Sequence, residues 1–139
     1  MKLLFVCTGN TCRSPMAEGF AKQIFTDAEV SSAGLFVNCG DSVSSNSVQA
    51  MKEYGIDISN HTPKQINMDM IEKVDYIIPM SNSHKQALIA NGVDKNKILC
   101  FSESISDPYG QSLEVYKQCA KQIKENIEKL YGELNDKKA

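Results

Sequence analysis

Residues 2–15, K-L-L-F-V-C-T-G-N-T-C-R-S-P, decide the fold of this chain. The first part, Lys2–Val6, is a short apolar run of the kind that forms a buried strand. After a polar loop, Ser14 and Pro15 predict the start of a helix, because Ser is a favoured N-cap and Pro fits the first helical position. The stretch therefore predicts a strand, a tight loop and a helix in direct succession.

Short apolar runs alternate with helical patterns along the rest of the chain. Further strands are predicted at Glu29–Ala33, Asp75–Met80 and Ile98–Phe101. Helices are predicted around Val48–Tyr54, at Asn67–Val74, at Ser83–Ala90 and over the apolar repeat Leu113–Leu134. This alternation predicts an α/β fold, a single-domain three-layer sandwich whose parallel sheet is covered by helices on both faces.

Length and composition limit the possible functions. The 139 residues suit one domain, 1–139, with residues 135–139 expected as a frayed polar tail. A net charge of −2 gives no general attraction to nucleic acid, and no apolar run approaches the length of a membrane span. Five cysteines, an odd number without an export signal, predict reduced thiols and a cytoplasmic location.

Parallel sheets bind ligands beyond the carboxyl ends of their strands, which directs attention to the loops after Val6 and Phe101. The first of these loops precedes a helix N-terminus, so its backbone N–H groups and the helix dipole favour an anion. Gly9 permits the positive φ that an inward-curling loop needs, and Arg13 matches two phosphate oxygens with its planar fork. The predicted ligand is phosphate or another oxyanion.

Cys7 lies at the base of this loop. A helix N-terminus and a neighbouring arginine both stabilise a thiolate, which is the nucleophilic form of cysteine. Beneath a bound phosphoryl group, that thiolate is placed for in-line attack on phosphorus. A nucleotide-type P-loop lacks support because there is no second Gly and no Lys, and a redox Cys-x-x-Cys fails on the spacing to Cys12. Paired zinc ligands are also missing, while two buried cysteines beside a turn stay open as the alternative.

The loop after Phe101 contains Asp107-Pro108-Tyr109-Gly110, which predicts a turn from its residue types. Such a sequence is typical of a plain surface turn. A rigid turn is also suited to holding a carboxyl group over a pocket, so the two interpretations are compatible.

The segment C-T-G-N-T-C-R-S-P resembles the signature loop of the low-molecular-weight protein tyrosine phosphatases. The resemblance extends to S-S-A-G at Ser31–Gly34, the segment of His61, Asp107-Pro108 and the final helix. It implies a four-stranded parallel sheet, a cysteinyl-phosphate intermediate, no metal and no cofactor, and phosphorylated proteins as substrates.

The resemblance also assigns roles to single residues. Cys7 is expected to be the nucleophile, Arg13 to stabilise the transferring oxygens, and Asp107 to be the general acid. His61 is expected to hold Asn10, whereas His84 is expected to be solvated on a polar helix face. Phosphate and substrate contacts are expected from Thr8, Gly9, Asn10, Thr11, Cys12, Ser14 and Tyr109. Phe36 is a candidate for either a pocket wall or the core.

Three substrates fit this chemistry, and the resemblance is greatest to the bacterial protein arginine phosphatase branch. That branch carries Thr at the position of Thr11, where tyrosine-specific relatives usually carry a branched aliphatic residue, and it also has a loop like Asp107–Gly110. Phosphoarginine is therefore predicted ahead of phosphotyrosine. Arsenate reduction would need two cysteines near Met80–His84, where there are none. A non-catalytic phosphate-binding module would need neither Cys7 nor Asp107.

Overall fold

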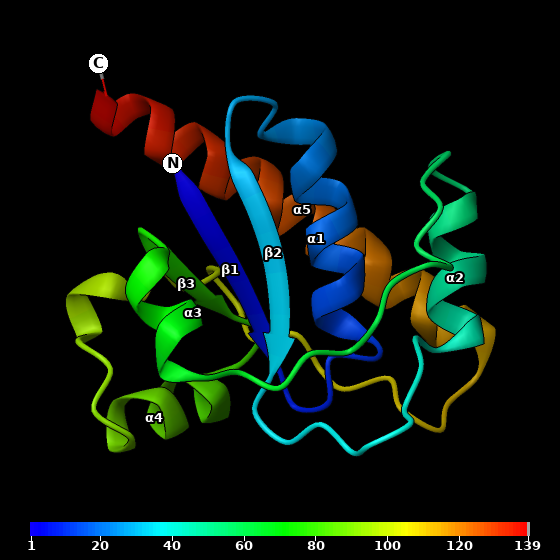
Figure 1. Ribbon diagram of the computed structural model, residues 1–139. Helices are drawn as coiled ribbons and strands as arrows, with labels where there is room; N and C mark the ends of the chain where they lie inside the picture. Colours follow the sequence, from blue (N-terminus) through cyan, green and yellow to red (C-terminus); the bar gives the residue numbers. More distant parts are fainter. Residues whose placement is uncertain (139) are drawn as a thin grey trace.

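Strand β1 (Lys2–Cys7) lies at the centre of a parallel sheet, between β2 (Glu29–Gly34) and β3 (Tyr76–Pro79) (Figure 1). The computed structural model describes residues 1–138 of the chain. All β1 side chains from Leu3 to Cys7 are buried, as expected for an apolar run in a sheet covered on both faces. The predicted parallel α/β architecture is confirmed.

The predicted fourth strand at Ile98–Phe101 is wrong, and the sheet within residues 1–138 has three strands. Ile98 makes only an isolated parallel bridge with Ile77, in which the Leu99 N–H donates to the Ile77 carbonyl over 2.9 Å. The next rung along this edge would require an N–H from Pro79, which proline lacks. The chain then leaves the edge through exposed residues 102–104, so no ladder develops.

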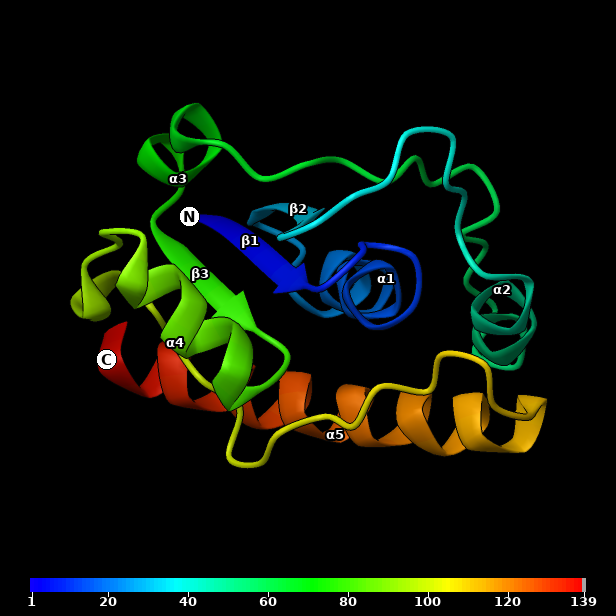
Figure 2. The ribbon, with the colours of Figure 1, turned by 90° about the horizontal axis from the view of Figure 1, so that it is seen from below.

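Two apolar layers follow from the pleat of β1, because successive side chains point to opposite faces. Leu3, Phe5 and Cys7 face one core, which α1 (Arg13–Ile24), α2 (Ser45–Lys52) and α5 (Leu113–Lys138) complete. Leu4 and Val6 face a second core with α3 (Met68–Lys73) and α4 (Asn82–Ala90). Figure 2 shows α4 beside β3 and α5 running along the length of the molecule.

Helix α1 begins at Arg13, which corrects the expected N-cap at Ser14. Cys12 occupies the capping position without a side-chain capping bond, and Ser14 lies in the first turn. The Ser14 hydroxyl contacts the Cys7 sulfur and the Asn10 side chain, so it is not available to a backbone amide. Pro15 remains compatible with the first turn, where backbone N–H groups have no helical partner.

The N-terminus and the C-terminal turns of α5 lie away from the loop that follows β1 (Figure 1). Helix α5 continues through residues 135–138 of the expected tail, and Ala139 lies outside the described residues. Within residues 1–138, every helix is too short or too polar to span a membrane.

Candidate active site

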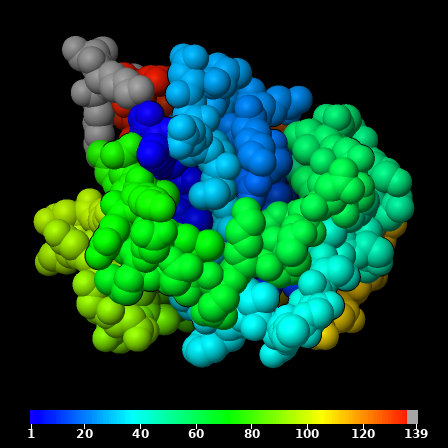
Figure 3. Space-filling model, in the orientation of Figure 1, coloured from blue at the N-terminus to red at the C-terminus, as the bar shows by residue number. Residues whose placement is uncertain are grey.

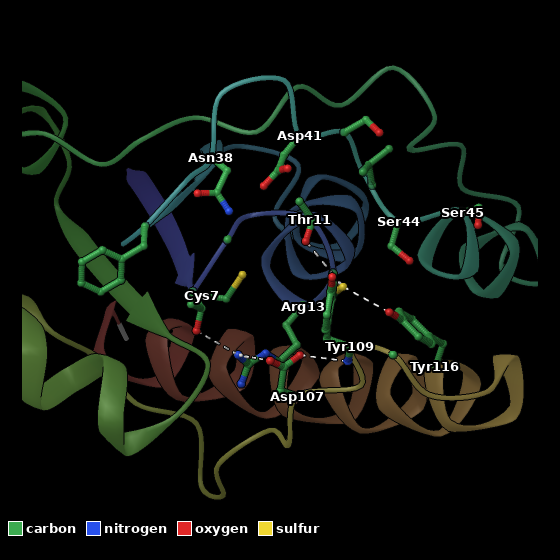
Figure 4. A pocket seen from close by; sticks show the side chains of 17 residues that line it. Cys7, Thr11, Arg13, Asn38, Asp41, Ser44, Ser45, Asp107, Tyr109 and Tyr116 are labelled. Carbon is green, nitrogen blue, oxygen red and sulfur yellow. Dashed lines mark hydrogen bonds and ion pairs between the residues drawn. The ribbon is translucent and has the colours of Figure 1, made fainter.

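A pocket of about 790 Å³ opens at the carboxyl end of the sheet (Figure 4). Its walls come from the loop between β1 and α1, the connection between β2 and α2, and the turn that precedes α5. Eight of the predicted site residues line it: Cys7, Thr8, Gly9, Thr11, Cys12, Arg13, Asp107 and Tyr109. Two others, Asn10 and Ser14, are absent from the wall and lie buried behind the loop.

Asn10 gives the loop its unusual backbone, with a φ of 57°. It is the one non-glycine residue with positive φ in the described chain, whereas Gly9 has no positive φ. The expectation for Gly9 is therefore wrong. Asn tolerates the left-handed region better than most residues, and here its side chain is also fixed.

The Asn10 side chain connects three segments. Its Nδ2 donates to Ser14 Oγ at 2.7 Å and to Ser32 Oγ at 3.0 Å. Its Oδ1 accepts from the Lys64 N–H at 2.9 Å and lies 3.1 Å from His61 Nε2. The prediction that His61 holds Asn10 is confirmed. Burial lowers the pKa of His61, and since its Nε2 faces two Asn10 oxygens, that nitrogen carries the hydrogen.

The segment that contains Lys64 crosses the carboxyl end of β2, as the green surface in Figure 3 shows. Gly34 ends β2 there and lies against the loop. A Cβ atom on Gly34 would approach Thr8 O to 2.8 Å and Asn10 N to 2.9 Å. Glycine is therefore required by close backbone approach, and the S-S-A-G sequence directly supports the loop.

The Cys7 sulfur lies 2.9 Å from Ser14 Oγ. Because an amide NH₂ only donates, Ser14 Oγ accepts from Asn10 and its own proton is free to point at Cys7. A hydroxyl donor and the N-terminus of α1 both stabilise negative charge on sulfur. The arrangement suits a thiolate.

Arg13 is 5% exposed and is held from two sides of the pocket. Its Nη1 donates to the Ile105 carbonyl at 2.9 Å, and its Nη2 lies 3.4 Å from Thr8 Oγ1 and 3.7 Å from Asp107 Oδ2. Its Nε is buried without a hydrogen-bond partner within the described residues. A buried unpaired donor costs about 1–3 kcal/mol, so an oxyanion that accepts from Nε would relieve this cost.

The turn at Asp107 is as predicted. The Tyr109 N–H donates to Asp107 Oδ1 at 3.0 Å, and Gly110 has a φ of 76°. Tyr109 and Phe36 are exposed at 76% and 74% and lie at the pocket mouth, so Phe36 is not a core residue.

Sequence reasoning missed three parts of this site. The loop after β2 contributes Asn38, Asp41 and residues 42–45 to the wall, and applying the strand-end rule to β2 would have found it. Tyr116 contributes its hydroxyl, 3.3 Å from Cys12 Sγ, and burial raises the pKa of Tyr116 to about 12. His84 is not solvated: it is 4% exposed, with Nε2 2.9 Å from Thr8 Oγ1.

Comparison with known proteins adds independent findings. Residues 2–139 match the model of the family "Low molecular weight phosphotyrosine protein phosphatase". The low molecular weight protein-tyrosine-phosphatase PtpB of Staphylococcus haemolyticus is 36% identical, over 94% of this chain and 97% of that protein. The protein-arginine-phosphatase of Bacillus subtilis is 32% identical, over 96% and 97%. The crystal structure of a low molecular weight protein tyrosine phosphatase from T. tengcongensis superimposes with a TM-score of 0.88 at 41% identity, covering 96% and 99%.

Proposed function

Because the chain belongs to the low molecular weight phosphotyrosine protein phosphatase family, we propose that it dephosphorylates arginine side chains of proteins through a phosphocysteine on Cys7. Membership makes it a cysteine-dependent, metal-independent protein phosphatase. Relatives of similar identity are named as tyrosine phosphatases and as arginine phosphatases, so the substrate has to be argued from the pocket.

In the first half-reaction, the Cys7 thiolate attacks phosphorus and the bond from phosphorus to the guanidine nitrogen breaks. Asp107 donates a proton to the leaving nitrogen, so that arginine departs as the stable guanidinium cation rather than as a strongly basic free guanidine. Arg13 and the loop amides bind the phosphoryl oxygens, whose charge is stabilised throughout the transfer. Arg13 Nη2 lies 3.7 Å from Asp107 Oδ2, so both groups face the same part of the pocket.

In the second half-reaction, the Asp107 carboxylate accepts a proton from water as that water attacks phosphocysteine. The bond between sulfur and phosphorus breaks, inorganic phosphate forms, and the thiolate returns. Ser14 Oγ, 2.9 Å from the sulfur, supplies a hydrogen bond to the departing thiolate. No other reactant is consumed.

The acceptors around the pocket are the observation that carries the preference for phosphoarginine. Thr11, Asp41 and Asp107 all line the wall, and Figure 4 shows them around the same opening. A guanidinium group is rich in N–H donors, and hydrogen bonds from it to carboxylates are charge-assisted. A phenyl ring has no N–H or O–H group that could donate a hydrogen bond to these acceptors.

Phosphotyrosine is the second candidate, and the exposed rings of Phe36 and Tyr109 at the mouth support it. Aromatic rings pack well against a flat phenyl group. Aromatic faces also bind guanidinium groups, so these two rings discriminate less than the acceptors do.

Replacing Thr11 tests the preference. Thr11→Val keeps the side-chain shape without the hydroxyl, and Thr11→Ile adds a methyl group as well. With peptides of one sequence carrying either phosphoarginine or phosphotyrosine, we expect the ratio of kcat/KM to shift towards phosphotyrosine by about tenfold, which corresponds to about 1.4 kcal/mol. Ser45→Ala, another hydroxyl in the lining, is the control and should leave the ratio unchanged. An unchanged ratio in both Thr11 variants would make phosphotyrosine the better assignment.

A further inference from the structure

We infer that His84 is a positioning residue for Arg13, acting through the hydroxyl group of Thr8 as a neutral imidazole that accepts a hydrogen bond at Nε2. This inference rests on the proposed role of Arg13 in binding the phosphoryl group. His84 itself does not line the pocket.

His84 occupies the first turn of α4 and fills the space between that helix and the loop after β1. Its Nδ1 lies 2.9 Å from Ser81 Oγ, and its Nε2 lies 2.9 Å from Thr8 Oγ1. With both ring nitrogens engaged and 4% of the residue exposed, the ring has one defined orientation.

The direction of each hydrogen bond follows from the Arg13 end. Arginine only donates, so Thr8 Oγ1 accepts from Arg13 Nη2 at 3.4 Å. Within the described residues, the recorded partners of Thr8 Oγ1 are Arg13 Nη2, which only donates, and His84 Nε2, so the Thr8 hydroxyl proton is assigned to His84 Nε2, the unprotonated nitrogen of the ring. His84 therefore carries its hydrogen on Nδ1 and donates it to Ser81.

The charges that face the ring agree with a neutral imidazole. Burial and the nearby positive charge of Arg13 lower the pKa of His84 to about 4, although Asp107 opposes them. An imidazolium would place a donor at Nε2, so the Thr8 hydroxyl would lose its acceptor there.

Ser81 supplies independent support. It holds the N-cap position of α4 in an extended conformation, and serine in that position usually accepts a hydrogen bond from the first turn of the helix. Here it makes no side-chain capping bond, and its hydroxyl contacts His84 and Ser83 Oγ, each at 2.9 Å. The Ser81 hydroxyl therefore orients the His84 ring instead of capping the helix.

Arg13 is held by contacts from two separate segments of the chain. Ile105 and Asp107 belong to the segment that precedes α5, whereas Thr8 is the contact from the loop after β1. His84 fixes the Thr8 hydroxyl and hence the only loop-side acceptor recorded for Nη2 in the described structure. Small displacements of a binding group can cost up to about a hundredfold in rate.

Two substitutions separate this role from simple packing. In His84→Gln, the amide oxygen reaches roughly the position of Nε2 and can accept from Thr8. In His84→Asn, the shorter amide reaches roughly the position of Nδ1 and retains only the Ser81 contact. Ser83→Ala, at the far end of the hydroxyl chain, is the matched control.

We expect His84→Asn to lower kcat/KM for an aryl phosphate by about tenfold and to weaken competitive inhibition by inorganic phosphate by a similar factor, which corresponds to the loss of one hydrogen bond. His84→Gln should stay within about threefold of the parent on both measures, and Ser83→Ala should match the parent. Thr8→Val combined with His84→Asn should be no worse than Thr8→Val alone, because both remove the same contact.

Equal losses in the Gln and Asn variants, or multiplying losses in the double variant, would overturn the inference. So would parental values in the Asn variant. Nitrogen NMR of the His84 ring in the unmodified protein is a second test, and it needs no variant. The hydrogen should be on Nδ1, and a hydrogen on Nε2 would overturn the assignment. If the parent hydrolyses neither the aryl phosphate nor a phosphoarginine peptide, the proposed function fails, while phosphate affinity and NMR still decide the role of His84.

Discussion

At the scale of single residues, the direction of hydrogen bonds at two hydroxyl groups organises the pocket. Ser14 and Thr8 each face a group that only donates, Asn10 Nδ2 and Arg13 Nη2 respectively. Both hydroxyl protons therefore point away from these donors, one towards the Cys7 sulfur and the other towards His84. The proposed nucleophile Cys7 and the cation Arg13 are thereby each contacted by a neutral hydroxyl group, that of Ser14 and that of Thr8 respectively.

Asp107→Asn tests the proton donor. We expect a loss of about 10²–10⁴-fold in kcat on a substrate with a poor leaving group, because that group departs without a proton. The rate of leaving-group release should fall much less on an activated aryl phosphate, whose leaving group departs readily without a proton. Stopped-flow release of the leaving group measures both. Equal losses on the two substrates would reduce Asp107 to a turn residue.

At the scale of elements, β1, its loop and α1 form one unit that β2 supports from the side. The sequence was sufficient for this unit, since an apolar run, a Gly-containing loop and Ser14-Pro15 each have a local physical meaning. It was insufficient for details that depend on neighbours. Ser14 is drawn to Cys7 instead of capping the helix, and Asn10 rather than Gly9 takes the positive φ because its side chain is held by Ser14 and Lys64.

Gly34→Ala tests the support that β2 gives to the loop. The added Cβ would meet backbone atoms of Thr8 and Asn10, which cannot move aside cheaply. We expect a loss of about 1–3 kcal/mol in unfolding free energy, as for overpacking, together with a fall in kcat/KM. Chemical denaturation and aryl phosphate turnover measure the two effects.

Gly132→Ala is the matched control for this substitution. Gly132 lies in α5, and a Cβ atom there meets nothing within 4 Å. Alanine favours helix by roughly 0.5–1 kcal/mol over glycine, so this variant should gain stability with unchanged turnover. A Gly34 variant that behaves like the Gly132 variant would contradict the close approach of β2 to the loop.

At the scale of the whole molecule, three strands rather than four support two cores and the candidate active-site pocket within residues 1–138. The absence of the fourth strand could have been predicted from the sequence, because Pro79 lies in the strand that would have paired with Ile98. The burial of His84 could not be predicted in this way, since its neighbours in the sequence are polar and its burial depends on tertiary contacts such as that with Thr8. The pocket wall from Asp41 likewise depends on how separate loops meet.

The stability of the folded molecule should depend on pH through its two histidines. The pKa of His84 is lowered to about 4 and that of His61 is lowered as well, both mainly by burial. Between about pH 6.5 and 4 the unfolded chain therefore binds more protons, and unfolding free energy falls as pH falls, by up to about 1.4 kcal/mol per pH unit for one proton. Urea denaturation across this range should show a shallower decline in His84→Gln. Identical declines would contradict a neutral, buried His84.

A covalent intermediate on Cys7 is the central claim, and its direct test is the mass of the peptide that contains residue 7 after a rapid denaturing quench during turnover. We expect one phosphoryl group on Cys7, most abundant in Asp107→Asn, where attack by water lacks its base. Cys7→Ser should lose turnover while phosphate binding partly survives, because Arg13 and the loop amides remain. Undiminished turnover by Cys7→Ser, or a phosphoryl group on a different residue, would contradict the account.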